Sequence, residues 1–296
     1  MTNNAMAWTS GDLPSFTGRT VVVTGANSGL GLAEATQLAR VGAKVVLAVR
    51  DTAKGEKAAA SIDGDTEVRR LDLADLASIR TFADEWTGDI AVLANNAGVM
   101  NVPEARTADG FEMQIGTNHL GHFALTNLLL PHITDRVVTM SSMMHRGGRI
   151  DLADLNWEHR SYNRVAAYGQ SKLANLMFSL ELQRRLAAAG STVRSLAAHP
   201  GYASTNLQTR TGNPVFDLGG RIGNKVIAQS AEAGAWPMLF AASQDVPGGS
   251  YVGPDKLNET RGHPALAGRT ARASDLTMCA KLWDLSEELT GVSFGG

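Results

Sequence analysis

The stretch that decides the fold is TVVVTGANSGLG, residues 20–31. Its first half is a β-branched run typical of a buried strand, and glycines follow at Gly25, Gly29 and Gly31. Apolar side chains at helical spacing continue over residues 30–40. A strand, a glycine turn and a helix N-terminus in this order present backbone N–H groups to a phosphate. The stretch predicts a dinucleotide-binding turn in which Gly31 lets the helix pack closely; the alternative is an ordinary turn with incidental glycines.

The same alternation of strand and helix continues along the chain. We predict strands over residues 20–24, 44–49, 67–71, 90–94, 136–140 and 192–198, and helices over residues 30–40, 52–62, 76–86, 111–130 and 166–189. The strands are apolar runs, as expected where both faces of a parallel sheet are covered. We therefore expect an α/β chain with a Rossmann-type doubly wound parallel sheet, helices on both faces and a single domain over residues 1–296. Residues 253–268 contain proline and glycine without periodicity and are predicted to form a loop.

Composition excludes several classes of protein. The 296 residues include 27 basic and 29 acidic side chains, and this net charge of −2 provides no basic surface for nucleic acid. A single cysteine, Cys279, excludes an internal disulfide and a thiolate zinc site. The seven histidines occur without an H-E-x-x-H pattern, so we expect no metal.

Targeting signals are missing as well. Residues 1–14 lack the basic start and the apolar run of a signal peptide. No stretch approaches the roughly 20 apolar residues that span a bilayer. We therefore expect a cytoplasmic protein without a transmembrane segment.

The end of the second predicted strand indicates which dinucleotide the glycine turn would bind. An NAD site usually carries an acidic residue there for the ribose 2′-hydroxyl. Here the strand ends at Val49 and Arg50 follows, and a guanidinium suits a 2′-phosphate through paired charge-assisted hydrogen bonds. We predict that NADP(H) is preferred. The alternative is that Arg50 is a surface charge and Asp51 binds the ribose, which would favour NAD(H).

Five further motifs follow the glycine turn in order. They are Asn95-Asn96-Ala97-Gly98, Asn118, Ser141-Ser142, Tyr168-x-x-x-Lys172 and Pro200-Gly201-x-x-x-Thr205. With these motifs the chain resembles the short-chain dehydrogenase/reductase family over nearly its whole length. Residues 168–176 (YGQSKLANL) and His199-Pro200-Gly201 are similar to the retinol-dehydrogenase-like branch of that family.

The pair Tyr168 and Lys172 carries the chemistry. The two residues are one helical turn apart and share one face of a predicted helix. A phenol has a pKa near 10, and a neighbouring ammonium stabilises the phenolate and lowers that pKa. The pair would therefore donate or accept a proton as a carbonyl and an alcohol interconvert. The alternative for Tyr168 is a core aromatic on an amphipathic helix.

The resemblance implies the roles of the other residues. Ser142, with Ser141 as the competitor, would hydrogen-bond the substrate oxygen. Asn118 would bend its helix and hold a water in a proton relay to Lys172; the alternative is a solvated polar side chain. The implied catalytic set is Asn118, Ser142, Tyr168 and Lys172.

The resemblance also implies the cofactor contacts. Lys172 would hold the nicotinamide ribose, the Asn95–Gly98 turn would face the adenosine side, and the segment from Pro200 would face the carboxamide. Asp72 would bind the adenine amine or cap a helix, with equal weight. The full set is Gly25, Asn27, Ser28, Gly29, Leu30, Gly31, Arg50, Asp72, Leu73, Asn95, Ala97, Gly98, Tyr168, Lys172, Pro200, Gly201 and Thr205.

One segment departs from the common family pattern. Between Ser142 and Tyr168 the chain is longer than in many members, with residues 146–164 as the extra segment. We interpret it as a surface excursion that still returns Tyr168 to the site. His145 in this region would line the substrate pocket or be a solvated loop histidine.

The expected function is an NADP-dependent oxidoreductase that transfers hydride between the nicotinamide and a hydrophobic alcohol or carbonyl compound. The competing hypothesis is a catalytically idle NADP(H)-binding sensor or interaction protein. An esterase built on Ser142 with His145 or His199 lacks the G-x-S-x-G turn. Residues 202–229 mix apolar side chains with glycines and are predicted to form a lid over an apolar small-molecule substrate.

The two long helices that carry Asn118 and Tyr168 are more apolar than one sheet contact requires. The resemblance implies assembly through them, so we expect a homodimer or homotetramer. The apolar residues are Leu120, Phe123, Leu125, Leu128 and Leu129 on the first helix and Leu173, Leu176, Phe178 and Leu180 on the second.

Overall fold

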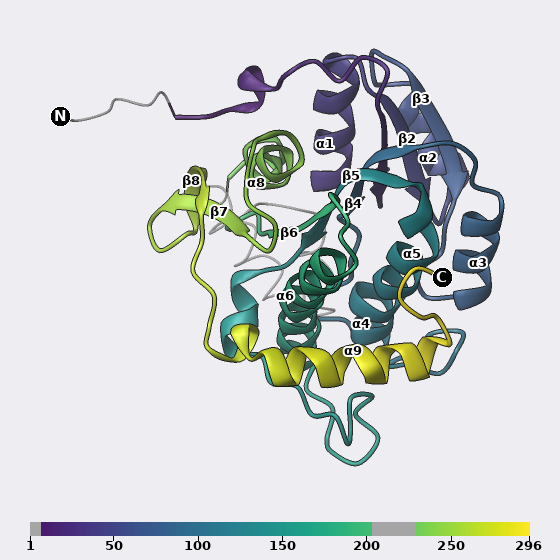
Figure 1. Ribbon diagram of the computed structural model, residues 1–296, viewed down its shortest axis with the longest axis vertical. Helices are drawn as coiled ribbons and strands as arrows, with labels where there is room; N and C mark the ends of the chain where they lie inside the picture. Colours follow the sequence, from purple (N-terminus) through teal and green to yellow (C-terminus); the bar gives the residue numbers. More distant parts are fainter. Residues whose placement is uncertain (1–6, 203–228) are drawn as a thin grey trace, which may run out of the picture.

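A single twisted sheet organises the chain, as the computed structural model shows for residues 7–202 and 229–296 (Figure 1). Its strand order is β3-β2-β1-β4-β5-β6-β7-β8. The strands are β1 (Thr20–Thr24), β2 (Lys44–Val49), β3 (Thr66–Arg70), β4 (Ile90–Asn95), β5 (Ile133–Met140), β6 (Arg194–Ala198), β7 (Tyr251–Lys256) and β8 (Arg261–Leu266). Strands β1 to β7 pair in parallel and β8 pairs antiparallel with β7. The order reverses between β1 and β4, which is where such sheets bind their ligands.

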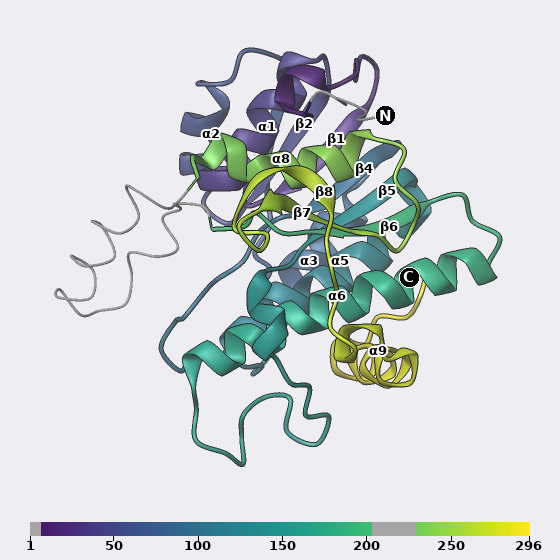
Figure 2. The ribbon, with the colours of Figure 1, turned by 90° about the vertical axis from the view of Figure 1, so that its left-hand side faces the viewer.

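Helices cover both faces of this sheet, as predicted (Figures 1 and 2). One face carries α1 (Gly29–Arg40), α2 (Thr52–Ala59) and α8 (Ala231–Ser243). The other carries α3 (Leu76–Asp84), α4 (Met113–Ile115), α5 (Gly121–Leu129) and α6 (Arg164–Ala188). Alternate residues of β1 enter two separate cores, Val21 and Val23 on the α1 side and Val22 on the α5 side. Burial on both faces explains why the strands are apolar runs.

The prediction of a loop over residues 253–268 was wrong. Most of this segment lies in the hairpin of β7 and β8, where Pro254 pairs with Pro264. Proline cannot donate to a ladder and is tolerated mainly on edge strands, and β8 is the edge of this sheet. Because the segment contains prolines and has no periodicity, its two strands could not be predicted from the sequence.

Helix α9 (Leu276–Thr290) lies outside the second layer, against α6 (Figure 2). Trp283 of α9 stacks on Phe178 of α6 with ring centroids 5.7 Å apart, and it contacts Phe123 of α5 at 4.8 Å. Phe123 is fully buried and Phe178 is 3% exposed. Much of the apolar surface that suggested a partner subunit is thus covered by this chain's own helix, so assembly stays a prediction without that support.

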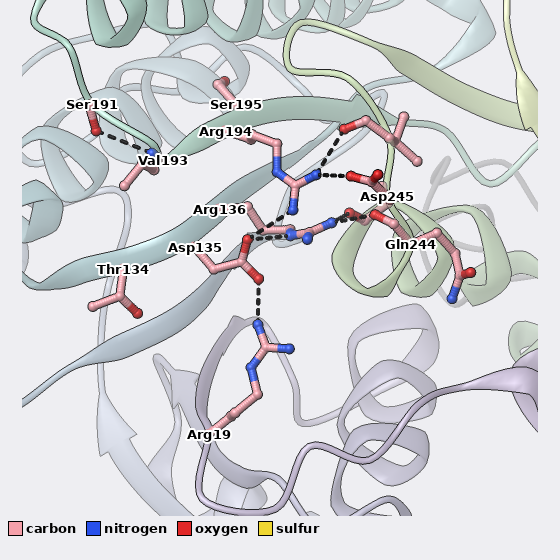
Figure 3. Close-up of polar contacts among 12 residues, drawn as sticks. Arg19, Thr134, Asp135, Arg136, Ser191, Val193, Arg194, Ser195, Gln244 and Asp245 are labelled. Atoms are coloured by element: carbon pink, nitrogen blue, oxygen red, sulfur yellow. Dashed lines mark hydrogen bonds and ion pairs between the residues drawn. The ribbon is translucent and has the colours of Figure 1, made fainter.

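An ionic cluster joins several strands near their amino ends, opposite the glycine turn at the carboxyl end of β1 (Figure 3). Asp135 of β5 pairs with Arg19, Arg136 and Arg194. Arg136 also donates hydrogen bonds to the main-chain oxygens of Ala241 and Gln244 at the end of α8, at 2.9 and 2.7 Å. These contacts fix β1, β5, β6 and α8 to one another. Among the described residues no helix is both long and apolar enough to cross a membrane.

Candidate active site

The glycine turn joins β1 to α1 and has the geometry that the sequence predicts. Gly25 and Gly29 have φ angles of +68° and +58°, which side chains rarely adopt. A Cβ at Gly31 would lie 2.5 Å from Asn96 Nδ2 and 2.7 Å from Gly25 O. The close approach of Gly31 is therefore toward the neighbouring loop and the turn itself. A cradle this tight, closed by the N-terminus of α1, fits a pyrophosphate.

The remaining turn residues line the start of α1. Ser28 is the exposed N-cap of the helix and makes no side-chain hydrogen bond to it. Asn27 and Leu30 are half-buried. The first N–H groups of α1 have no partner within the helix, as in any helix, and are directed toward this edge.

The carboxyl ends of β2 and β3 carry the residues that would distinguish the two cofactors. Arg50 is exposed directly after β2. Asp51 is the N-cap of α2, where its carboxylate accepts a hydrogen bond from Lys54 N at 3.1 Å and pairs with Lys54 Nζ at 2.8 Å. Its carboxylate already has these partners, which weakens the alternative that it binds the ribose.

The loop after β3 holds Asp72 and Leu73. Asp72 Oδ1 accepts from Ala74 N at 3.0 Å, and the N-cap of α3 is Asp75. Asp72 is therefore not the cap of that helix. Leu73 is buried, and its main chain lies so close to Gly121 that a Cβ added at Gly121 would clash with it.

The loop after β4 meets the glycine turn. Ala97 N donates to Thr24 Oγ1 at 2.9 Å, and a Cβ at Gly25 would lie 3.0 Å from Ala97 Cβ. The Asn95 side chain is buried and donates to Thr126 Oγ1 of α5 at 2.8 Å, so it faces the core beneath this loop. A contact between Asn95 and the cofactor stays a prediction.

Asn118 lies in an irregular helix, as predicted. Residues Gly116–Leu120 form a turn of π-helix, η2, between α4 and α5. Asn118 is fully buried, so the solvated alternative is wrong. Its Nδ2 donates to Val99 O and to Ser171 Oγ, both at 2.9 Å, and its Oδ1 accepts from Val99 N at 2.7 Å. Asn118 thus holds the loop after β4 against α6.

Ser142 and Tyr168 meet although a long segment separates them. Ser142 is the N-cap of the short helix η4 (Met143–Gly147), accepts a hydrogen bond from Met144 N at 3.2 Å, and lies close enough to the Tyr168 side chain to lower the pKa of the phenol. The intervening residues fold back onto α4, where Tyr162 donates to Glu112 Oε1 at 2.9 Å. The excursion therefore returns Tyr168 to the site. Ser141, the competitor, is buried and donates to Lys172 O at 2.8 Å.

Lys172 lies behind Tyr168 on α6. Its Nζ donates to Met140 O at 3.1 Å, and a Cβ at Gly98 would lie 3.5 Å from that Nζ and 3.0 Å from Asn118 Oδ1. Burial lowers the pKa of Lys172 to about 8 and raises the pKa of Tyr168 to about 12, against a smaller lowering by the hydrogen bond with Ser142. This raised pKa is opposite in direction to the lowering expected from the ammonium, because desolvation of Tyr168 is the largest effect.

The segment after β6 meets the β7–β8 turn. Gly201 has φ +67° and packs against Thr260 O of the β7–β8 turn, while Pro200 precedes it half-buried. Thr205 lies outside the described residues, as does most of the predicted lid. The lid's two end residues are held together, because Gln229 N donates to Tyr202 O at 2.9 Å.

Several residues near the site make contacts that the sequence does not predict. His145 is buried, and its Nδ1 lies 2.7 Å from Ser142 O, so it braces the serine turn and is not a solvated histidine. Glu259 pairs with Arg146 at 2.8 Å and lies 3.3 Å from His199 Nε2. His122 hydrogen-bonds both Thr24 and Asn118 O at 3.0 Å. The described residues contain no cluster of three or more metal-ligating side chains.

Comparison with known proteins agrees with this geometry. Residues 19–214 match the short chain dehydrogenase family. The chain belongs to this family. Human retinol dehydrogenase 13 is 41% identical over 96% of this chain and 89% of its own length, and mouse polyprenol dehydrogenase is 40% identical over 96% and 87%. The resemblance to the retinol-dehydrogenase-like branch is thus confirmed.

Two solved structures are similar to this short-chain dehydrogenase. An uncharacterized protein from Mycobacterium Paratuberculosis is 58% identical, with a TM-score of 0.86 over 97% of this chain and 99% of its own. A structure described as an NAD(P)-dependent gluconate 5-dehydrogenase from Beutenbergia cavernae, with bound NADP, is 28% identical with a TM-score of 0.59, covering 77% and 91%. The protein is therefore an oxidoreductase acting on alcohol or carbonyl groups with a nicotinamide cofactor.

Proposed function

We propose that this short-chain dehydrogenase interconverts a hydrophobic alcohol and its carbonyl compound, prefers NADP(H), and uses Tyr168, Lys172, Ser142 and Asn118. The observation that carries the proposal is that the Lys172 ammonium lies 5.7 Å from the centre of the Tyr168 ring, with Ser142 close enough to lower the pKa of the phenol. The four side chains come from three separate segments of the chain. Convergence of this kind is typical of a catalytic site.

Each side chain has a role that follows from its position. The bound nicotinamide supplies or accepts the hydride. The Ser142 hydroxyl donates a hydrogen bond to the substrate oxygen and stabilises the charge that develops there. Tyr168 donates its proton to that oxygen in reduction and accepts one in oxidation. Lys172 and Asn118 hold the loop of Gly98 and the tyrosine in register.

The preference for NADP(H) rests on Arg50. Its guanidinium is exposed at the carboxyl end of β2, whereas the nearby Asp51 is engaged at the start of α2. A planar guanidinium binds a phosphate through two parallel hydrogen bonds. The apolar substrate class is supported by the names of the relatives, retinol and polyprenol dehydrogenases.

A panel of substrates tests the proposal. NADPH and NADH oxidation is followed with apolar aldehydes, ketones and quinones, using the wild type and Tyr168→Phe. We expect turnover of apolar aldehydes or ketones with NADPH in the wild type and little in the variant. Tight NADPH binding without turnover on any substrate would favour the idle sensor instead.

A further inference from the structure

A chain of hydrogen bonds joins the cofactor-binding loops to Asn118 through a buried histidine. Ala97 N lies 2.9 Å from Thr24 Oγ1, Thr24 Oγ1 lies 3.0 Å from His122 Nε2, and His122 Nδ1 lies 3.0 Å from Asn118 O. Thr24 and Asn118 are fully buried and His122 is 1% exposed. Solvent therefore cannot replace Thr24, His122 or Asn118 without a rearrangement.

The partners determine where each proton lies. The carbonyl oxygen of Asn118 can only accept, so His122 Nδ1 carries the hydrogen and donates it. A neutral imidazole has one N–H, so Nε2 accepts from the Thr24 hydroxyl. The hydroxyl oxygen in turn accepts from Ala97 N, and its other acceptor, Ala94 O, is more distant at 3.4 Å.

The ring is neutral across the physiological range. Burial, assisted by the charge of Lys172 and opposed by the hydrogen bond to Asn118 O, lowers the pKa of His122 to about 4. A protonated ring would present a second N–H to Thr24 Oγ1 and leave the Thr24 hydroxyl only the more distant Ala94 O, at 3.4 Å, as its acceptor. The neutral ring with its hydrogen on Nδ1 gives the Thr24 hydroxyl the shorter hydrogen bond, at 3.0 Å.

The ends of the chain lie at the two parts of the site that must cooperate. Thr24 is the last residue of β1 and leads into the glycine turn, and Ala97 packs on Gly25. Asn118 O belongs to the π-helical turn η2, and the Asn118 side chain hydrogen-bonds Val99 and Ser171. His122 is the link between the pyrophosphate cradle and the turn of Asn118.

We propose that His122, protonated on Nδ1, is a positioning residue for the reaction, which fixes the Asn118 turn against the glycine turn and so makes cofactor affinity and turnover depend on each other. This inference rests on the proposed function. Histidine side chains commonly use one ring nitrogen to orient the other. Here both ring nitrogens are engaged, one by Thr24 and the other by Asn118 O.

The chain offers matched controls. His119 is also a buried histidine and belongs to the π-helical turn of Asn118, but its Nε2 lies 3.0 Å from Ser286 Oγ of α9. Asn127 shows that an asparagine on α5 can donate to the main-chain oxygen four residues earlier, since its Nδ2 lies 2.9 Å from Phe123 O. An asparagine at position 122 could therefore keep the bond to Asn118 O and lose the bond to Thr24.

The first test is spectroscopic and needs no substrate. The protein is labelled with ¹⁵N in its histidine rings, and long-range ¹H–¹⁵N spectra are recorded with and without NADPH, with His122→Asn assigning the signal. We expect the Nδ1-protonated tautomer of His122 in both states. The Nε2-protonated tautomer, or an imidazolium at pH 7, would overturn the inference.

The second test measures the coupling. We expect Thr24→Val and His122→Leu each to weaken NADPH binding and lower kcat by about fivefold or more, and the double variant to lose little beyond one single variant. Thr24→Ser should bind NADPH and turn over as the wild type does. His122→Asn should retain a larger fraction of the wild-type kcat than of the wild-type NADPH affinity. His119→Asn should lower the melting temperature while affinity and kcat stay unchanged.

Independent losses would contradict the proposal. If the double variant loses the product of the two single effects, or if His119→Asn changes affinity and kcat as much as His122→Leu, then His122 has only a general packing role. Tautomer and NADPH affinity are measured without turnover. They therefore decide this inference even where no substrate is found and the proposed reaction fails.

Discussion

The ammonium nitrogen of Lys172 lies 5.7 Å from the centre of the Tyr168 ring, and desolvation shifts the pKa of both groups. The only polar contact that the described residues make with this ammonium is the main-chain oxygen of Met140 at 3.1 Å. A buried cation with one neutral partner destabilises the fold. The site therefore carries a cost in stability that catalysis requires.

Replacement of Lys172 should reveal this cost. Its pKa falls from 10.5 to about 8 in the fold, so the unfolded chain binds more protons between these values and stability rises with pH through that window. The penalty is complete below about pH 8 and reaches at most roughly 3 kcal/mol. We expect Lys172→Met to raise the free energy of unfolding in urea at pH 7, to lose this advantage near pH 10.5, and to abolish turnover. Lower stability of the variant at pH 7 would contradict the assignment.

Arg50 should determine the choice of cofactor. Loss of a charge-assisted pair to the 2′-phosphate costs about 1.5–3 kcal/mol, so Arg50→Ala should weaken NADPH binding by at least about tenfold. NADH lacks that phosphate and its affinity should stay the same. Fluorescence titration with both cofactors measures this, with Lys57→Ala on the exposed side of α2 as a control of equal charge change. Equal losses for both cofactors, or a similar loss in the control, would remove the argument.

Gly31 should tolerate no side chain, whereas Gly147 should. A Cβ at Gly31 would lie 2.5 Å from Asn96 Nδ2 and 2.7 Å from Gly25 O, while a Cβ at Gly147 meets nothing within 4 Å. We expect Gly31→Ala to open the glycine turn, costing about 1–3 kcal/mol of stability and most of the cofactor affinity. Gly147→Ala should change neither. Thermal unfolding and NADPH titration check this pair, and a stable Gly31→Ala that binds NADPH normally would show that the cradle is looser than described.

The fold could be predicted where a local pattern carries it. The bounds of the strands and helices from β1 to β6 agree to within a few residues with those predicted from the sequence. Buried parallel strands are apolar runs and their crossover helices are amphipathic, so both are recognisable from a local pattern. The β7–β8 hairpin could not be recognised, because Pro254 and Pro264 pair at the sheet edge. The cover provided by α9 also escaped prediction, because it depends on which helix face Trp283 contacts.

Part of the candidate site could likewise be predicted from the sequence and part could not. Tyr168, Lys172, Ser142 and Asn118 were recognised from motifs, and the structure brings Ser142 to Tyr168 despite the long segment between them. Asn95 belongs to a motif as well, yet its side chain faces α5, because a loop sequence does not determine which residue turns inward. His122 could not be assigned, because its partner Thr24 is 98 residues away in the chain.

In the proposed reaction Tyr168 protonates a carbonyl oxygen as the nicotinamide delivers hydride to its carbon. The most direct measurement uses NADPH deuterated at the transferable C4 position with an apolar aldehyde, followed by mass spectrometry of the alcohol. We predict one deuterium on the carbinol carbon with the wild type, and a rate lowered by at least about a hundredfold in Tyr168→Phe, the range typical of a lost general acid. Alcohol without deuterium, or equal rates in the two proteins, would contradict the account.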